Sequence, residues 1–288
     1  MSEQSRGPYA PSDARIAREA AARRAARRSS MIAAVSTLIV GVVLVVGVTH
    51  TPGWDRVQAS FFSWDYARQS FPDVVQGLWL NIRVMVVCEV LILGIGLAVA
   101  LSRTTRSPLL FPLRIAAAAY TDVFRGLPLL LVIFLLGLGV PALRINGLTN
   151  SVVVWGAAAL VLTYSAYVAE VLRAGIESVH PTQRMAARAL GLTPAQTTRH
   201  VVLPQAVRRV IPPLLNDLVS LQKDSGLISV LGAIDAIKAA AIDTAMSFNF
   251  TPYVVAGALF VLLTIPLARY TDWLSARMAS RQQQGGVA

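Results

Sequence analysis

The sequence predicts an all-α protein that is embedded in a membrane and crosses it about six times. Three observations support this fold class: the composition, the long apolar runs and the uneven placement of basic residues. Hydrophobic residues make up 55% of the 288 residues and charged residues only 14%, whereas a soluble domain has about 25% charged residues. The mean hydropathy of +0.58 excludes a disordered chain and argues against a soluble globular protein. The single cysteine, Cys88, excludes an internal disulfide framework and any multi-cysteine metal site.

The predicted spans are apolar runs of roughly the 20 residues that a helix needs to cross a bilayer. They cover residues 31–48, 77–101, 126–142, 152–171, 211–233 and 252–274. The third is expected to begin earlier, because residues 109–120 are also apolar. A signal peptide is the alternative for the first run, since basic residues precede it. The run is longer than a usual signal core and no small-residue cleavage site follows, so we expect an uncleaved anchor helix over 31–49.

Basic residues are concentrated on one set of connections. Of the 26 Lys and Arg residues, 20 lie in the N-terminal tail, in 102–125, in 173–209 and at the C-terminal end, and four lie on the other side. Positively charged connections stay in the cytoplasm, so both tails, 1–30 and 278–288, are predicted to be cytoplasmic.

The N-terminal tail carries six arginines from Arg15 to Arg28. Such a tract binds nucleic acid in some proteins. Here it directly precedes an apolar run, so we expect it to contact anionic lipid and no nucleic acid.

The predicted outer loop, residues 50–76, is rich in aromatic side chains. Two interpretations fit: an interfacial helix at headgroup depth, or a docking surface for a partner. The aromatic residues are Trp54, Phe61, Phe62, Trp64, Tyr66 and Phe71.

The long cytoplasmic loop, residues 176–210, predicts two short helices joined by a glycine turn. Pro181 suits a first helical turn and Gly191 the residue after a helix end. Thr193 followed by proline resembles an N-cap, and a residue before proline avoids helical backbone, so Leu203-Pro204 is expected to end the second helix. One face of the first helix is small and apolar: Met185, Ala186, Ala189 and Leu190. This face suits either a groove on another protein or packing on the chain's own membrane helices.

The same loop resembles the signature E-A-A-x3-G-x9-I-x-L-P of the permease subunits of bacterial binding-protein-dependent ABC importers. The spacing matches at every step, but Met185 stands for Glu and Val201 for Ile. The residues that carry the match are Met185, Ala186, Ala187, Gly191, Val201, Leu203 and Pro204.

Three further segments are similar to the amino-acid branch of that family. GLWLNIRVMVV resembles its first core helix, Asp122–Leu131 its FRG-x-P segment, and Asn216–Gly232 its N-E-x5-K-D-x-S-L stretch. The residues of the FRG-x-P match are Phe124, Arg125, Gly126 and Pro128. The resemblance covers 77–277 and leaves the anchor helix outside.

The resemblance implies a type I ABC importer permease in the bacterial cytoplasmic membrane. Two permeases, either two copies of this chain or this chain and a paralogue, would form the path. A pair of ABC ATPase subunits would bind ATP and Mg²⁺, an external solute-binding protein would deliver the substrate, and this chain would hold no cofactor. The resemblance assigns ATPase coupling to Met185, Ala186, Ala187, Leu190, Gly191, Val201, Leu203 and Pro204.

Polar residues inside the predicted spans are candidates for the substrate path, because each one is costly in a bilayer. They are Glu89, Asn216, Asp217, Ser220, Lys223 and Asp224. Asn216, Ser220 and Lys223 share one helical face, and Ser225-Gly226 would allow a bend. The alternative is a structural network in which Lys223 pairs with a carboxylate such as Glu89, and a structural role is slightly favoured for Glu89.

The sequence therefore favours a transport subunit for an amino acid, not an enzyme. It has no phosphate-binding loop G-x-x-x-x-G-K-[ST], and its histidines have no metal-ligand spacing, so no metal site is expected. The alternatives are an importer for another small solute, a membrane scaffold or an intramembrane enzyme.

Overall fold

The computed structural model describes residues 13–105 and 107–284. The first 12 residues of the predicted basic tail and the last four of the C-terminal tail lie outside this part of the chain. The described residues form α-helices with short 3-10 and π turns and no strand. Four of the helices are long and apolar enough to cross a membrane, or up to six if each of two bent pairs counts as one span. This range includes the predicted six.

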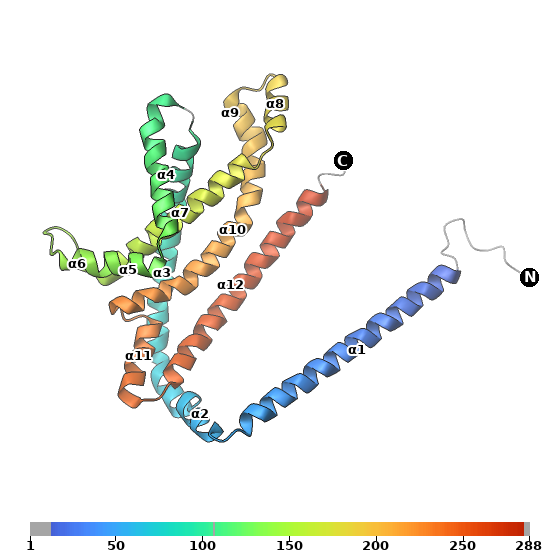
Figure 1. The fold of residues 1–288 in the computed structure, drawn as a ribbon, viewed down its shortest axis with the longest axis vertical. Helices are drawn as coiled ribbons and strands as arrows, with labels where there is room; N and C mark the ends of the chain where they lie inside the picture. The colour runs from blue at the N-terminus through green and yellow to red at the C-terminus, as the bar shows by residue number, and fades with distance from the viewer. Residues whose placement is uncertain (1–12, 106, 285–288) are drawn as a thin grey trace, which may run out of the picture. The chain divides into compact units, whose positions relative to one another are not determined.

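Two compact units make up the chain, residues 1–59 and 60–288. The first contains α1, Asp13–Thr49, and most of α2, Trp54–Phe61. Helix α1 runs without a break from the basic residues into the apolar run (Figure 1). At 1.5 Å per residue it is about 55 Å long, so residues 13–30 of the predicted tail and the anchor are parts of one helix. The apolar side chains of α1 form no core of their own.

The segment predicted as an outer connection, 50–76, is mostly helical, as the interpretation of an interfacial helix requires. It consists of α2 and the first turns of α3, Trp64–Thr104, which continues through Pro72. Phe61 stacks on Phe250 with ring centroids 5.1 Å apart. The second unit begins at Ser60, so it contains the start of α3 as well as the predicted importer segment 77–277.

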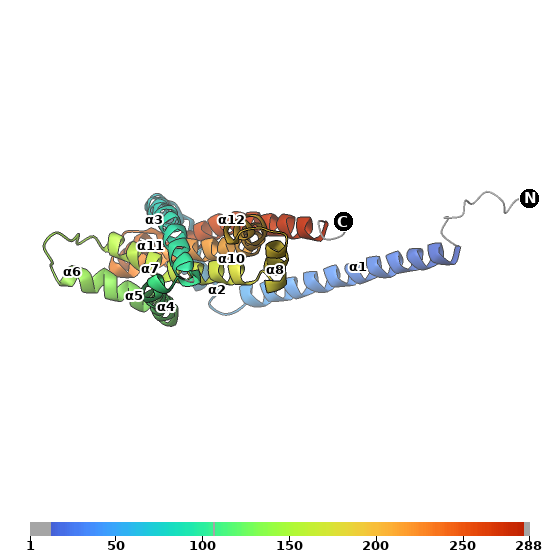
Figure 2. The same ribbon diagram turned by 90° about the horizontal axis from the view of Figure 1, so that it is seen from above.

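The remaining helical elements follow in chain order. They are η1 Pro108–Leu110, α4 Phe111–Gly126, α5 Leu129–Phe134, η2 Leu135–Gly139, α6 Val140–Ala142, α7 Val152–Glu177, α8 Pro181–Ala189, α9 Pro194–Thr197, η3 Thr198–Val202, α10 Leu203–Asp224, η4 Ser225–Leu231, α11 Ala236–Ser247 and α12 Thr251–Gln284. Within the second unit, α8 and α9 lie at one end and α11 at the other (Figures 1 and 2). Helix α12 runs from the α11 end towards the end that carries α8.

The core of the second unit lies where α3 crosses α7. Val84, Cys88 and Ile92, spaced four apart, present one apolar face of α3 to the buried residues of α7, α10 and η4. A Cβ added at Gly96 would lie 2.6 Å from Val168 Cγ1, so this glycine allows the two helices to approach closely. An added Cβ at Gly94 meets no atom within 4 Å.

The third predicted span, 126–142, is not one straight helix. Helix α4 begins at Phe111, as the apolar residues before it suggested, and ends at Gly126. The chain then turns through 105° before it continues into α5, η2 and α6. Leu127 and Pro128 have extended backbone at this corner, because the residue before a proline avoids helical backbone.

The fifth predicted span, 211–233, also differs from the structure. Helix α10 begins at Leu203 and includes Pro204 in its first turn, so Leu203-Pro204 starts a helix and does not end one. The π turn η3 joins α9 directly to α10. From Ser225 the helix tightens to 3-10 geometry, and the chain bends by 47° after Leu231, beyond the Ser225-Gly226 position where a bend was expected. Gly232, with φ +89°, ends that segment.

A buried polar junction fixes η4 and α11 to α3. Asn81 donates to Ser225 O at 3.1 Å and to Asp235 Oδ2 at 3.0 Å, and its Oδ1 accepts from Ala236 N at 3.2 Å. Asp235 also caps α11 by accepting from Lys238 N at 2.8 Å. Asn81 is 2% exposed and Asp235 is 0% exposed. The backbone groups of Ser225 and Ala236 are therefore hydrogen-bonded to a side chain of the protein where water has little access.

Candidate functional site

The loop between α7 and α10 forms the predicted helix, glycine turn and helix. Helix α8 starts with His180 as N-cap and Pro181 in the first position. Gly191 follows the helix with φ +87°, a backbone conformation that side chains with a Cβ rarely adopt. Helix α9 starts with a capping box between Thr193 and Gln196. Three local sequence signals therefore position the loop.

The apolar face of α8 is open. Met185 is 61% exposed and Leu190 is 83% exposed, and Ala186 and Ala189 are exposed as well. Ala187, in contrast, is 5% exposed. In this structure the face is therefore not packed on the chain's own membrane helices, which had been one of two possibilities. Of the other signature residues, Leu203 is 50% exposed, Pro204 is exposed and Val201 is half-buried.

Two arginines attach this loop to the end of α7. Arg184 donates to the backbone oxygen of Ile176, and Arg209 donates to that of Ser178 at 2.5 Å. These carbonyl groups lie at the C-terminal end of α7, where the negative end of the helix dipole favours cations. Arg184 thus connects α8, and Arg209 connects α10, to the end of α7.

Glu170 connects α7 to two other helices. Its carboxylate lies 2.7 Å from Arg103 of α3, 2.5 Å from Arg173 of α7 and 3.7 Å from Arg125 of α4. Arg173 also pairs with Glu177. Arg125 belongs to the family segment, so one role of that segment is to fix the end of α4.

The other residues of the family segment shape the corner between α4 and α5. Phe124 packs against the cluster around Val132 and Ile133, and its ring lies 5.0 Å from that of Tyr120. Gly126 is the last residue of α4, and the Pro128 carbonyl accepts from the first amides of α5.

One face of α7 carries a polar row from the loop to the membrane interior. Tyr164, Tyr167, Glu170, Arg173 and Glu177 follow at steps of three or four residues, which places them on one side of a helix. The Tyr164 hydroxyl donates to Asp224 Oδ2 at 2.7 Å, and the Tyr167 ring lies under the Arg125 guanidinium. The row ends at the junction of α10 and η4.

The candidate path residues divide into two groups. Asn216 and Lys223 are exposed and Ser220 is half-buried, so the predicted polar face of α10 is open in the single chain. Among the described residues, no carboxylate lies within the 4 Å of an ion pair from Lys223. The structural pairing of Lys223 with Glu89 is therefore wrong for this structure.

The acidic candidates lie closer to the core. Glu89, Asp217 and Asp224 are each half-buried. Asp217 Oδ2 is buried and has no hydrogen-bond partner within residues 13–105 and 107–284. Asp224 is bound to Tyr164 and is therefore partly structural. The three carboxylates are therefore less exposed than Lys223, which lies on an open face.

Several polar residues of the core were not among the sequence-predicted sites. Gln222 is 2% exposed and accepts from the Thr264 hydroxyl at 2.6 Å, which joins α10 to α12. Asn81, Asp235 and Glu170 were also missed. Their signal was the same as for the predicted sites, a polar residue within or beside an apolar run.

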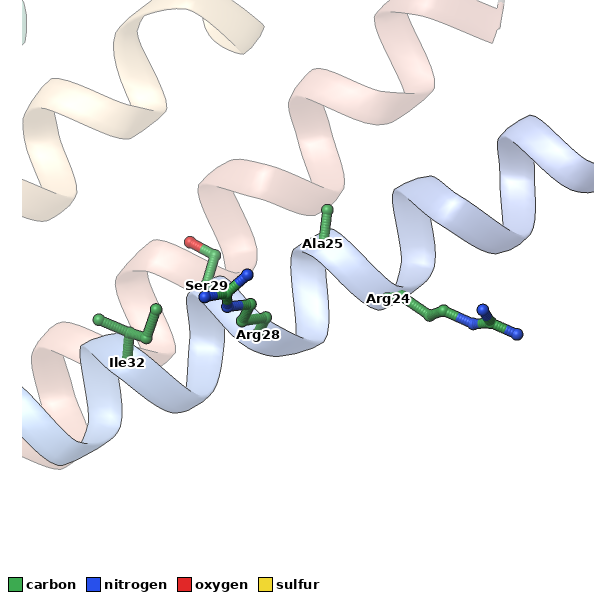
Figure 3. A pocket seen from close by; sticks show the side chains of 5 residues that line it. All are labelled: Arg24, Ala25, Arg28, Ser29 and Ile32. Atoms are coloured by element: carbon green, nitrogen blue, oxygen red, sulfur yellow. The ribbon is translucent and has the colours of Figure 1, made fainter.

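Two hollows on the surface are not lined by any of the candidate path residues. Figure 3 shows one that is lined by side chains of α1 alone, Arg24, Ala25, Arg28, Ser29 and Ile32. Another lies between the ends of α3, α11 and α12 and is lined by Tyr66, Gln69, Ser70, Asp243, Met246, Ser247 and Pro252. The described part of the chain has no cluster of three or more residues suited to hold a metal ion.

Comparison with known proteins identifies the family. The profile of the family described as binding-protein-dependent transport system inner membrane component matches residues 91–280. The chain belongs to this family. It is therefore an inner membrane transport subunit of the multi-pass type, which confirms the predicted resemblance, and not an enzyme. Membership implies two kinds of partner, an ATP-hydrolysing subunit and a solute-binding protein.

The alignments of this transport subunit with individual relatives cover most of the length of each relative. A probable glutamine ABC transporter permease protein GlnM of Bacillus subtilis is 36% identical over 187 residues, which is 64% of this chain and 83% of the relative. The arginine transport system permease protein ArtQ of the same organism is 32% identical over 68% of this chain and 88% of its own. A crystal structure of an amino acid ABC transporter with histidines aligns with a TM-score of 0.66 and 31% identity, covering 72% of this chain and 94% of that one.

Proposed function

We propose that this chain is the membrane-spanning permease subunit of an ABC importer for a polar amino acid. The observation that carries the proposal is the loop of residues 176–210. It holds an exposed apolar helix face, fixed by a glycine turn, at one end of a helical membrane unit. The relatives named as glutamine and arginine permeases support the substrate class.

In this proposal α8 is the coupling helix. The face formed by Met185, Ala186 and Leu190 enters a groove on an ABC ATPase subunit, which binds ATP and Mg²⁺. Gly191 sets the turn, and Val201, Leu203 and Pro204 lead into α10. Closure of two ATPase subunits pushes α8, and the arginine contacts to the α7 end pass that movement into the membrane.

The substrate path lies along the open polar face of α10. Asn216, Ser220 and Lys223 offer hydrogen bonds and an ammonium group, and the carboxylates of Glu89, Asp217 and Asp224 lie beside them. Groups of both charges suit an amino acid, which carries an ammonium and a carboxylate. A second permease, either another copy of this chain or a paralogue, covers the open face and completes the path.

The orientation follows from the basic residues. The end that carries α8 faces the cytoplasm, and both chain tails lie on the same side. The basic part of α1 contacts anionic lipid, and the external solute-binding protein meets the opposite end.

The test is co-purification of the tagged full chain from gently solubilised native membranes, with Gly191→Pro as the variant. Proline fixes φ near −65° and cannot adopt the +87° of Gly191. Gly147→Pro is the matched control, because Gly147 has φ +91° but lies in the predicted outer connection. An ATPase with a phosphate-binding loop should accompany the wild type and the Gly147 variant and be lost with the Gly191 variant. If both variants retain the ATPase equally, the ATPase contact lies elsewhere in the chain. If no ATPase co-purifies with any form of the chain, the importer proposal is contradicted.

A further inference from the structure

The arginines around the α8 loop fall into two groups, those that bind to other groups of the chain and those that are exposed. Arg173 pairs with Glu170 and Glu177, and Arg184 and Arg209 donate to carbonyl oxygens at the end of α7. These guanidinium groups serve the chain's own fold. In contrast Arg188, Arg199 and Arg208 are exposed and have no carboxylate within ion-pair distance among the described residues.

The loop itself contains no acid that could neutralise these charges. From Ser178 to Asn216 the sequence has no aspartate and no glutamate. The nearest glutamate, Glu177, is already engaged by Arg173. The exposed surface of this loop therefore carries basic side chains that no carboxylate of the loop neutralises.

The centre of the same surface is apolar. Met185 and Leu190 are among the most exposed apolar residues of the loop, and Arg188 lies three positions after Met185, which makes their side chains neighbours on the helix. An apolar centre with a charged rim is the usual anatomy of a protein interface. Charged rims also select partners, because like charges that meet across an interface are unfavourable.

We propose that α8 of this chain fits an ATPase groove with an apolar floor and an acidic rim, which rests on the proposed function as a permease. This chain has Met185 at the position of the signature glutamate. The ATPase groove therefore needs no cation opposite residue 185. The rim of the groove carries aspartate or glutamate side chains opposite Arg188 and Arg199. The pairing is selective: an ATPase whose groove presents a cation for the signature glutamate would repel this loop.

The experiment measures the affinity of the purified full chain, in detergent or nanodiscs, for the ATPase that co-purifies with it. Met185→Glu, which restores the residue of the signature, is expected to weaken binding at least tenfold, because it places a carboxylate on the apolar floor of the groove, within its acidic rim. Met185→Leu keeps the site apolar and is expected to lose less affinity than Met185→Glu. Arg188→Glu is expected to weaken binding roughly tenfold, and wild-type affinity is expected to fall as salt screens the rim charges.

Arg68→Glu is the matched control, since it makes the same charge change at an exposed site on the predicted outer side. It is expected to leave ATPase affinity unchanged. Met185→Cys then locates the groove by cross-linking, because the only natural cysteine, Cys88, is buried. Replacing the groove carboxylate nearest the cross-link with a basic residue should restore ATPase binding by the Arg188→Glu variant.

The outcomes separate the two proposals. If no ATPase binds any form of the chain, the proposed function fails. If an ATPase binds but Met185→Glu binds equally or more tightly, or salt and Arg188→Glu have no effect, the acidic groove is wrong while the permease function stands. If Arg188→Glu reduces only co-purified anionic lipid and leaves ATPase binding intact, the free arginines serve the membrane surface and the inference is overturned.

Discussion

Replacement of Asn81 by alanine is expected to destabilise the helical unit without touching the coupling loop. The side chain makes three hydrogen bonds, to Ser225 O, Asp235 Oδ2 and Ala236 N, at 3.1, 3.0 and 3.2 Å. All of the groups involved are almost fully buried. The variant therefore leaves two acceptors and one donor without this partner in a place that water does not easily reach.

The magnitude depends on how much each bond contributes. Hydrogen bonds between transmembrane helices average about 0.6 kcal/mol, which gives about 2 kcal/mol for three. In soluble proteins a buried group left unsatisfied costs about 1–3 kcal/mol, which gives at least about 3 kcal/mol. A loss of about 2–3 kcal/mol lowers the melting temperature of a domain of this size by roughly 4–12 °C.

The assay is thermal unfolding of the purified chain in detergent, with Asn216→Ala as the matched control. Asn216 is also an asparagine of a membrane helix, but it is exposed. The control is expected to melt within about 1 °C of the wild type. If Asn81→Ala melts at the wild-type temperature, or if both variants shift equally, the buried junction does not hold α11 to α3.

Three further substitutions test other parts of the structure. Gly77→Val is expected to lower the amount of folded protein in the membrane, measured by immunoblot, because an added Cβ would lie 2.5 Å from Ala236 N; Gly94→Val, in open space, should not. Glu170→Gln removes the carboxylate that Arg103 and Arg173 share. It is expected to lower the free energy of unfolding by about 1–3 kcal/mol, between the values for exposed and buried ion pairs. A melting temperature equal to that of the wild type would refute this. Lys223→Met is expected to reduce uptake more than membrane abundance, and a proportional fall in both would make the residue structural.

The local sequence signals predicted the loop well, because its turns depend on neighbouring residues. Pro181, Gly191 and Thr193 specify a helix start, a left-handed turn and an N-cap through their own backbone and side-chain preferences. Leu203-Pro204 shows the limit of such signals. A proline marks either the residue after a helix or the first turn of one, and here the π turn Thr198–Val202 keeps the chain helical up to it.

The bend in the third span could not be predicted from hydropathy. Hydropathy marks a boundary near the corner, because Asp122 and Arg125 precede it and residues 129–136 are apolar, but it gives no angle between the two helices. The angle of 105° is set by the packing of Phe124 and the contacts of Arg125, which are tertiary interactions.

The polar junctions depend on residues far apart in the chain. Asn81 and Asp235 are 154 positions apart, and Arg103 and Glu170 are 67 apart. Sequence periodicity shows that each of these side chains is unusual in an apolar run, but it gives no partner. For the same reason the sequence offers Glu89 as a candidate partner of Lys223, although Lys223 is exposed and pairs with no carboxylate among the described residues.

The most direct test of the transport function is uptake of a panel of labelled amino acids by cells that lack this chain, with and without the full chain restored. Loss of ATP-dependent uptake of one or a few polar amino acids, and its recovery with the wild type but not with Gly191→Pro, is the expected result. Unchanged uptake of every amino acid in the panel, together with loss of ATP-dependent uptake of another solute, would contradict the amino-acid assignment.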